Sequence, residues 1–194
     1  MGKIFTHLTM SLDGFIANPD DTPGEIFDWY QAGDVSFPSA NEDVSLEVDE
    51  ASAEVLHELV DGVGALVCGR RLFDITDGWG DQHPMGAPVV VVTHRPVENP
   101  ERWPRTTFVG DVAEGIAAAR EIAEDRDVTI LSPNIIQQAL DLGVVDEVCV
   151  SIAPALYGEG IPYFAKLERG HVLFDDPVVV QGTGAVHLRY PVRH

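Results

Sequence analysis

Continuous apolar runs alternate with amphipathic segments over most of the chain. Residues 65–68 and 89–93 are dominated by hydrophobic side chains, which is typical of strands covered on both faces of a sheet. Looser strand-like patterns occur at residues 3–10, 106–109, 127–131 and 145–153. The pattern therefore predicts strands at all of these positions, most of them separated by helices.

Helix start signals lie between several of these strands. Asp49, Asp111 and Ser132 each precede an amphipathic segment, where a short polar side chain can cap the first turn. Pro133 follows Ser132 at the first helical position, which needs no backbone N–H. The first helix is expected over residues 50–61, ended by Gly62, and the last is expected to run to Leu142, ended by Gly143.

The pattern changes near the end of the chain. Residues 172–181 and 185–192 are β runs joined by Gly182, Thr183 and Gly184, which is typical of an antiparallel hairpin. Alternating strands and helices followed by such a hairpin predict an α/β fold, with a mostly parallel central sheet and helices on both faces. Residues 74–86 are rich in Gly, Asp and Pro, so an exposed loop is expected there. With no repeat or linker, residues 1–194 are expected to form one domain.

Residues 64–73 join a buried strand to a polar turn. Gly69 lets the backbone turn sharply or approach a ligand, because it has no Cβ. Arg70 and Arg71 follow in what reads as the first turn of a helix, and guanidinium groups beside free N–H groups are good receptors for a phosphate monoester. The alternative is a surface arginine pair that serves only solubility.

Polar residues of this kind recur at three strand ends. They are Gly69-Arg70-Arg71, Thr93-His94-Arg95 and Ser132-Pro133-Asn134. Because ligands of open α/β sheets bind at the carboxyl ends of the strands, a dinucleotide would fit this arrangement. The Rossmann glycine fingerprint and the Walker A sequence are both absent from the chain.

Composition narrows the choice of partners. The net charge is −20 with only 12 lysines and arginines, so nucleic acid and anionic membrane surfaces are disfavoured. Arg70, Arg71 and Arg95 are a quarter of these cations, and their convergence would create a local site for an anion. No apolar run is long enough to span a bilayer, and the two cysteines lie in strand-like runs, so a reduced, cytoplasmic protein is expected.

Other site chemistries find less support. The seven histidines are scattered without metal-ligand spacing, so a metal site is not expected, and there is no Gly-x-Ser-x-Gly sequence for a nucleophilic serine. Cys68 adjoins the arginines, which could lower its pKa, but its apolar strand favours an inert core thiol. Asp13 and Asp28 lie near predicted loops and are candidates for an acid group or for binding an aminopyrimidine.

Four motifs together resemble a known family. In chain order they are Thr9-x-Ser11-Leu12-Asp13-Gly14-Phe15-Ile16-Ala17, Gly69-Arg70-Arg71-x-Phe73-Asp74, Thr93-His94-Arg95-Pro96 and Val144-Val145-Asp146-Glu147. The chain resembles the dihydrofolate-reductase-like family related to the C-terminal reductase domain of the bifunctional riboflavin-biosynthesis deaminase-reductase. The resemblance implies a three-layer αβα fold, NADPH-dependent reduction of a pyrimidine- or pteridine-type substrate, and a homodimer.

The resemblance also implies roles for individual residues. Gly69, Arg70 and Arg71 would bind the 2′-phosphate region of NADPH, and this agrees with the arginines expected from the residues alone. Asp13 would stand near the substrate as the catalytic candidate, with Asp28 and Trp29 on the substrate side. The remaining cofactor contacts implied are Ile16 and Ala17 at the nicotinamide, Thr93, His94 and Arg95 at the adenine and its phosphate, and Leu131, Ser132, Asn134 and Ile135 at the strand end and helix start.

One motif departs from the family pattern. Members usually carry two glycines where this chain has Ser132-Pro133, and where the backbone approaches the pyrophosphate. Two side chains and a missing N–H make close approach harder, although the helix N-terminus and the Ser132 hydroxyl could still bind phosphate. Two functions therefore stay open: an NADPH-dependent reductase, or a non-catalytic dimeric ligand-binding protein that kept the fold. Glu159, in a turn where the family favours glycine, alters the expected substrate contacts.

Overall fold

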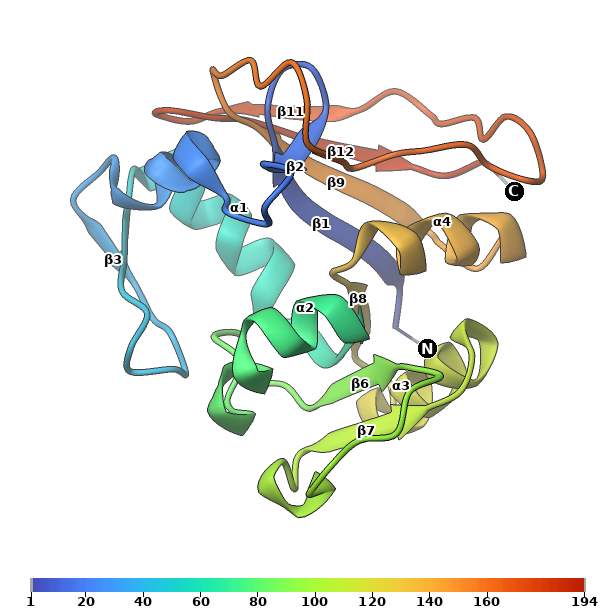
Figure 1. Cartoon of the computed structure of the whole chain (residues 1–194). Helices are drawn as coiled ribbons and strands as arrows, with labels where there is room; N and C mark the ends of the chain where they lie inside the picture. Colours follow the sequence, from blue (N-terminus) through green and yellow to red (C-terminus); the bar gives the residue numbers. More distant parts are fainter. Residues whose placement is uncertain (1, 194) are drawn as a thin grey trace.

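The computed structural model describes residues 2–193, which form one central sheet with helices on both faces (Figure 1). Within these residues the main sheet has eight strands in the order β11-β12-β9-β1-β8-β5-β6-β7. Their bounds are β1 (Ile4–Met10), β5 (Val63–Gly69), β6 (Val89–Val92), β7 (Thr106–Val109), β8 (Asp127–Ile130), β9 (Glu147–Ile152), β11 (Val178–Gln181) and β12 (Val186–Pro191).

Six neighbouring strands of the sheet, β9, β1, β8, β5, β6 and β7, are parallel to one another. Strands β12 and β11 add an antiparallel hairpin at the β9 edge. The α/β fold with a mostly parallel sheet is therefore confirmed, and so is the C-terminal hairpin. Because all parallel strands point the same way, their carboxyl ends meet along one edge of the sheet, where ligands of such sheets bind.

Alternate side chains of β5 enter two different cores. Ala65 and Val67 pack with α3 (Val112–Ala123) and α4 (Pro133–Leu142), whereas Leu66 and Cys68 pack with α1 (Glu50–Val60). This burial on both faces is the reason that the segment reads as a continuous apolar run. In Figure 1, α1 and α4 accordingly lie on opposite sides of β1.

Two of the three predicted helix caps form as expected. The Asp49 carboxylate accepts hydrogen bonds from the N–H groups of Ala51 and Ser52, and Asp111 accepts one from Glu114. Ser132 stands at the N-cap of α4, but its hydroxyl makes no cap bond. The helix begins where the sequence places it, while the serine has another partner, described below.

Short elements in two segments were not predicted from the sequence. Strands β3 (Val35–Phe37) and β4 (Leu46–Val48) pair with each other in a largely polar region, and β2 (Phe15–Ala17) pairs with β10 (Ile161–Pro162). The expectation of an exposed loop over residues 74–86 is wrong in part, because α2 (Arg70–Ile75) extends into it and η2 (Asp77–Asp81) follows, with Gly78 and His83 buried. The other short 3₁₀ segments are η1 (Gly24–Gln31) and η3 (Pro100–Arg102).

In the described chain, no helix combines the length and the apolar character needed to cross a membrane.

Candidate active site at the carboxyl edge of the sheet

A large cleft opens at the carboxyl ends of the parallel strands. Its volume is about 1280 Å³, and its lining is mostly apolar. Pockets for one drug-sized ligand measure roughly 300–1,000 Å³, so this cleft is larger than a typical single-ligand pocket. The predicted residues that line it are Ile16, Ala17, Gly69, Arg70, Arg71, His94, Leu131, Ser132, Asn134 and Ile135.

Five predicted residues lie outside this lining: Asp13, Asp28, Trp29, Thr93 and Arg95. Thr93 and Arg95 are nevertheless tied to the site. The Thr93 hydroxyl accepts a bond from the Arg95 backbone N–H at 3.1 Å and donates to the Arg95 carbonyl at 3.2 Å, which shapes the turn that follows β6.

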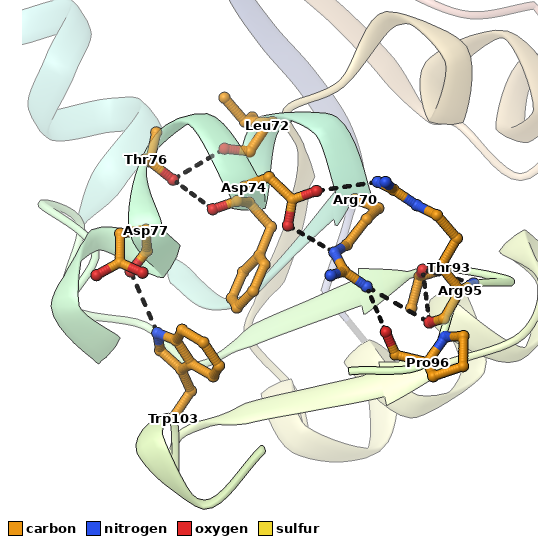
Figure 2. Close-up of polar contacts among 10 residues, drawn as sticks. Arg70, Leu72, Asp74, Thr76, Asp77, Thr93, Arg95, Pro96 and Trp103 are labelled. Carbon is orange, nitrogen blue, oxygen red and sulfur yellow. Dashed lines mark hydrogen bonds and ion pairs between the residues drawn. The ribbon is translucent and has the colours of Figure 1, made fainter. Parts of the chain in front are cut away.

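Arg70 and Arg95 converge on one carboxylate, as Figure 2 shows. Arg70 Nε lies 2.6 Å from Asp74 Oδ1, and an Arg95 terminal nitrogen lies 2.9 Å from Asp74 Oδ2. Arg70 also donates to the Pro96 carbonyl at 3.1 Å. Each guanidinium has five N–H donors, so Arg95, which is 64% exposed, keeps most of its donors available to an anion.

Arg71 forms a separate ion pair across the mouth of the cleft. Its Nε and one terminal nitrogen donate to both oxygens of Asp21, the shortest contact being 2.6 Å. The hydrogen bond to Asp21 raises the pKa of Arg71 further. The role of Asp21 was missed, since nothing local in the sequence connects two residues that stand 50 positions apart. With Asp21 and Asp74 paired, the three arginines keep one net positive charge.

The hydroxyl of Ser132 links two strand ends. It accepts a 2.9 Å hydrogen bond from the backbone N–H of Gly69, which fixes the end of β5 against the start of α4. Since no side chain caps α4, the first-turn N–H groups beyond Pro133 face the cleft without a capping partner.

Gly69 is not required by the fold itself. Its φ is −89°, an ordinary value for any residue, and an added Cβ would come no closer than 3.5 Å to Ile135. An added Cβ would thus be in ordinary contact with Ile135 and Ser132, and Gly69 is one of the residues that line the cleft.

Asp13 binds a neighbouring turn instead of facing the cleft. Its carboxylate accepts bonds from Ser11 Oγ at 2.6 Å, the Gly158 N–H at 2.7 Å and the Tyr157 N–H at 3.1 Å. The Ser11 bond, followed by that of Gly158, lowers the pKa of Asp13 to about 2. An ionised carboxylate of this kind is a poor proton donor at neutral pH.

The placement of Trp29 corrects the sequence expectation. Its side chain is only 1% exposed, and its Nε1–H donates to Thr9 Oγ1 at 3.2 Å, so it packs in the core behind the cleft. Asp28, on the same 3₁₀ segment, is exposed and lies outside the cleft lining. The neighbour that does line the cleft is Tyr30, whose ring stacks on Trp29 at a centroid distance of 4.0 Å; burial raises the pKa of Tyr30 to about 12.

A buried chain of hydrogen bonds begins at the cleft with His7. His7 Nε2 lies 3.1 Å from Ser151 Oγ, which lies 2.8 Å from His187 Nδ1. His187 Nε2 then contacts Ser52 Oγ at 3.0 Å, and Ser52 donates to the helix-capping carboxylate of Asp49 at 2.6 Å. Burial, and then the nearby His187, lower the pKa of His7 to about 4, so the ring is neutral near pH 7. The sequence did contain a sign of this role for His7. Residues two apart on a strand share a face, so His7 lies on the same face of β1 as Thr9.

Both thiols are buried and free. Burial raises the pKa of Cys68 to about 12, which disfavours the thiolate and supports the reading of an inert core residue. Among residues 2–193 no group of three His, Cys, Asp or Glu side chains is placed to hold a metal ion.

A family model for the RibD C-terminal domain matches residues 2–171. The chain belongs to the RibD C-terminal domain family. The match covers most of the chain, and it agrees with the resemblance inferred from the four motifs.

Solved structures show that this family member has the fold of known reductases. A protein from Shewanella sp. PV-4 with the provisional name of a riboflavin biosynthesis protein is 24% identical over 99% of both chains, with a TM-score of 0.71. Dihydrofolate reductase from Enterococcus faecalis, solved with NADP(H), is 14% identical over 100% of this chain and 98% of its own, with a TM-score of 0.60.

The Thermotoga maritima diaminohydroxyphosphoribosylaminopyrimidine deaminase/5-amino-6-(5-phosphoribosylamino)uracil reductase also matches, at 14% identity and a TM-score of 0.60. The match covers 99% of this chain but only 57% of that longer protein. No curated protein matches the sequence.

Proposed function

We propose that this member of the RibD C-terminal domain family is an NADPH-dependent reductase that transfers a hydride to a small heteroaromatic substrate. The observation that carries the proposal is the cleft at the carboxyl edge of the sheet. It is lined by Arg70 and Arg71, by the uncapped start of α4 and by a large apolar wall. Its volume is sufficient for a dinucleotide and a second, smaller molecule.

The residues present fit a dinucleotide phosphate. Arg70 and Arg71, with Arg95 beside them, would bind the 2′-phosphate, and the donors that Arg70 and Arg95 do not use on Asp74 suit a doubly charged anion. The first turn of α4, which lines the cleft beside Gly69, suits the pyrophosphate. Ile16 and Ala17 would line the nicotinamide, which supplies the hydride when NADPH is bound.

The chain's own contribution is to orient the substrate and to provide a side chain that can donate a hydrogen bond to it. The two carboxylates that line the cleft are already engaged, since Asp21 pairs with Arg71 and Asp111 caps α3. Neutral groups at the floor, His7, Thr9 and Tyr30, are therefore the side chains that can hold a proton-donating hydrogen bond to the substrate.

Calorimetric titration of an arginine variant tests the cofactor assignment. Arg70→Ala/Arg71→Ala should weaken NADPH binding at least tenfold, about 1.4 kcal/mol or more, while NADH binding changes little, because only NADPH has the 2′-phosphate. Arg102→Ala/Arg193→Ala removes two exposed arginines outside the cleft and is the matched control. Equal losses for NADPH and NADH would contradict the assignment.

A second candidate function is a ligand-binding protein without reductase activity. It is favoured by the engagement of the Ser132 hydroxyl with Gly69 and by the missing N–H of Pro133, which together reduce the donors available to a pyrophosphate. NADPH oxidation in the presence of a pterin or a flavin precursor, lost in the arginine variant, would exclude this candidate.

We further infer a cytoplasmic homodimer from the family resemblance. The sheet ends at β11, where Val178 and Val179 are 48% and 59% exposed, and such an apolar edge strand is suited to pairing with a second copy. Sedimentation at micromolar concentration distinguishes the dimer from a 21.1 kDa monomer.

A further inference from the structure

Two parts of the cleft lining differ in charge. Among the described residues, four that line the cleft carry Asp or Arg side chains: Asp21, Arg70, Arg71 and Asp111. The lining residues between positions 27 and 60 and between positions 72 and 85 are what we call the apolar wall. The apolar wall contains no Asp, Glu, Lys or Arg.

Hydrogen bonds join the two segments of the apolar wall. The Ala40 N–H donates to the Pro84 carbonyl at 2.8 Å, and the Asn41 side chain donates to the Gln82 carbonyl at 2.9 Å. Gln82 returns a bond from its side-chain amide to the Ala40 carbonyl. The β3–β4 hairpin and the loop after α2 therefore form one continuous surface, although the bonded residues stand 41 or more positions apart in the sequence.

The backbone of the apolar wall is strained where it presents its largest side chain. Trp79 has φ 53°, within a run of left-handed residues from Asp77 to Asp81. This conformation is unfavourable for a residue with a Cβ. It is held by the Trp103 indole, which donates to the Asp77 carbonyl, and by Asp81, which accepts from the Arg105 N–H. Strain of this kind is commonly kept at ligand-binding sites.

The polar groups of the apolar wall are uncharged. His83 is 8% exposed, and its Nδ1 accepts a 3.1 Å bond from the Met85 N–H, so the neutral ring carries its proton on Nε2. The Thr76 hydroxyl is already bonded to the Leu72 carbonyl. The hydroxyl of Tyr30 and the Nε2–H of His83 are thus neutral groups that can orient a ligand.

Among the described residues, the cations nearest the apolar wall are already engaged. Arg71, which precedes Leu72 and lines the cleft, pairs with Asp21. Arg102 pairs with Asp77 and stacks on Trp103, and Arg105 donates to the Gly86 carbonyl; neither lines the cleft. A phosphate or carboxylate placed against the apolar wall would lose its hydration without gaining an ion pair, which is strongly unfavourable.

We propose that the substrate of this cleft is an uncharged ring compound, bound against the apolar wall by its faces and oriented by neutral hydrogen bonds. This inference rests on the proposed function, which makes the ligand at the apolar wall the substrate that accepts the hydride. It distinguishes the chain from the Thermotoga maritima relative, whose name specifies a phosphoribosyl substrate.

Two fluorescent probes that differ by one charged group test this inference. N-phenyl-1-naphthylamine is neutral, and 8-anilinonaphthalene-1-sulfonate is the same ring system with a sulfonate. The comparison uses the variant Asp21→Asn/Arg70→Ala/Arg71→Ala/Asp74→Asn/Arg95→Ala, which removes the three arginines together with the two carboxylates that pair with them. The preference of the apolar wall can then be measured whether or not NADPH binds. We expect the neutral probe to bind at least tenfold more tightly.

Variants locate the binding. Phe27 and Ile75 line the cleft and are 43% and 53% exposed, so Phe27→Ala/Ile75→Ala should weaken the neutral probe about tenfold while leaving the core intact. Leu142→Ala/Leu173→Ala removes comparably exposed side chains outside the cleft and should change nothing. Equal or tighter binding of the sulfonate, or no effect of Phe27→Ala/Ile75→Ala, would overturn the inference. Calorimetry with NADPH on the wild-type protein reports separately on the proposed function.

Discussion

Asp13, the catalytic candidate in the sequence, lies outside the cleft lining and binds the turn that begins at Tyr157. Its carboxylate accepts the N–H groups of both Tyr157 and Gly158, so it holds the turn of residues 157–160 next to β2. Because its pKa is about 2, it performs this function at every pH at which an enzyme of this kind would work. We therefore assign Asp13 a positioning role.

Hydrogen exchange can test that role directly. Asp13→Asn should speed exchange of the Gly158 amide at least tenfold, because an amide oxygen is a weaker acceptor than a carboxylate and cannot accept all three bonds. Asp20→Asn is the matched control, since Asp20 is an exposed carboxylate bonded only to nearby Thr22. Unchanged protection at Gly158 in Asp13→Asn would contradict the assignment.

At the same scale, the arginines illustrate what a sequence can and cannot predict. Their presence at a strand end was sufficient to predict an anion site, since parallel strands bring their carboxyl ends together. The pairing of Arg71 with Asp21 was not predictable, because it depends on a helix and a loop that meet only in the folded chain. The burial of Trp29 was missed for a similar reason: its partners, Thr9 and His187, come from strands distant in sequence.

Among the elements, helix α1 is hydrogen-bonded to distant parts of the chain through its capping residue. Its capping residue Asp49 also accepts bonds from Ser52 Oγ and from the Thr183 N–H, at 2.6 and 2.8 Å. The helix is thereby connected to the turn between β11 and β12 and to the buried chain that ends at His7.

The two confirmed caps should differ in their contribution to stability. Asp49→Ala should lower the free energy of unfolding by about 2–3 kcal/mol, because a cap and two further hydrogen bonds are lost together. Asp111→Ala removes a cap with one bond, to Glu114, and should cost about 1 kcal/mol. Urea unfolding of both variants measures the difference; equal losses would mean that the bonds to Ser52 and Thr183 add nothing.

Element prediction succeeded where local signals and tertiary burial agree. The runs at β5 and β6 are apolar because both faces are covered, and the caps of α1 and α3 are local. The β3–β4 hairpin has strands of three residues each and is stabilised by packing of Phe37 and Val48 against α1, which the sequence pattern does not show. At α4 the sequence predicts the start correctly, but the Ser132 hydroxyl accepts a bond from Gly69, a contact between distant segments that local signals do not show.

For the whole molecule, the buried histidines predict an acid-sensitive fold. His7 and His83 are 6% and 8% exposed, and burial lowers the pKa of each to about 4 from an ordinary 6.5. The unfolded chain binds these protons first, so their contribution to stability is complete above pH 6.5 and is lost as the pH falls towards 4. The loss should be about 1.4 kcal/mol per pH unit for each ring.

Urea unfolding between pH 7 and 4 checks this prediction. His83→Gln should reduce the pH slope by about 1.4 kcal/mol per unit, and the exposed His171→Gln should leave it unchanged. Because both variants keep the acidic residues that give the net charge of −20, the effect of charge repulsion cancels in the comparison. An identical slope in His83→Gln and the wild-type protein would show that this ring is not held neutral by burial.

The central claim is that the cleft binds NADPH through its 2′-phosphate, and the most direct test is thermal unfolding of the wild-type protein with NADPH and with NADH. A ligand at 100 times its dissociation constant adds about 2.7 kcal/mol to stability, which a melting curve resolves. A clear upward shift with NADPH and little with NADH, at equal concentrations, is the predicted result. No shift with either cofactor would contradict the claim and would favour a ligand-binding protein that has kept the reductase fold.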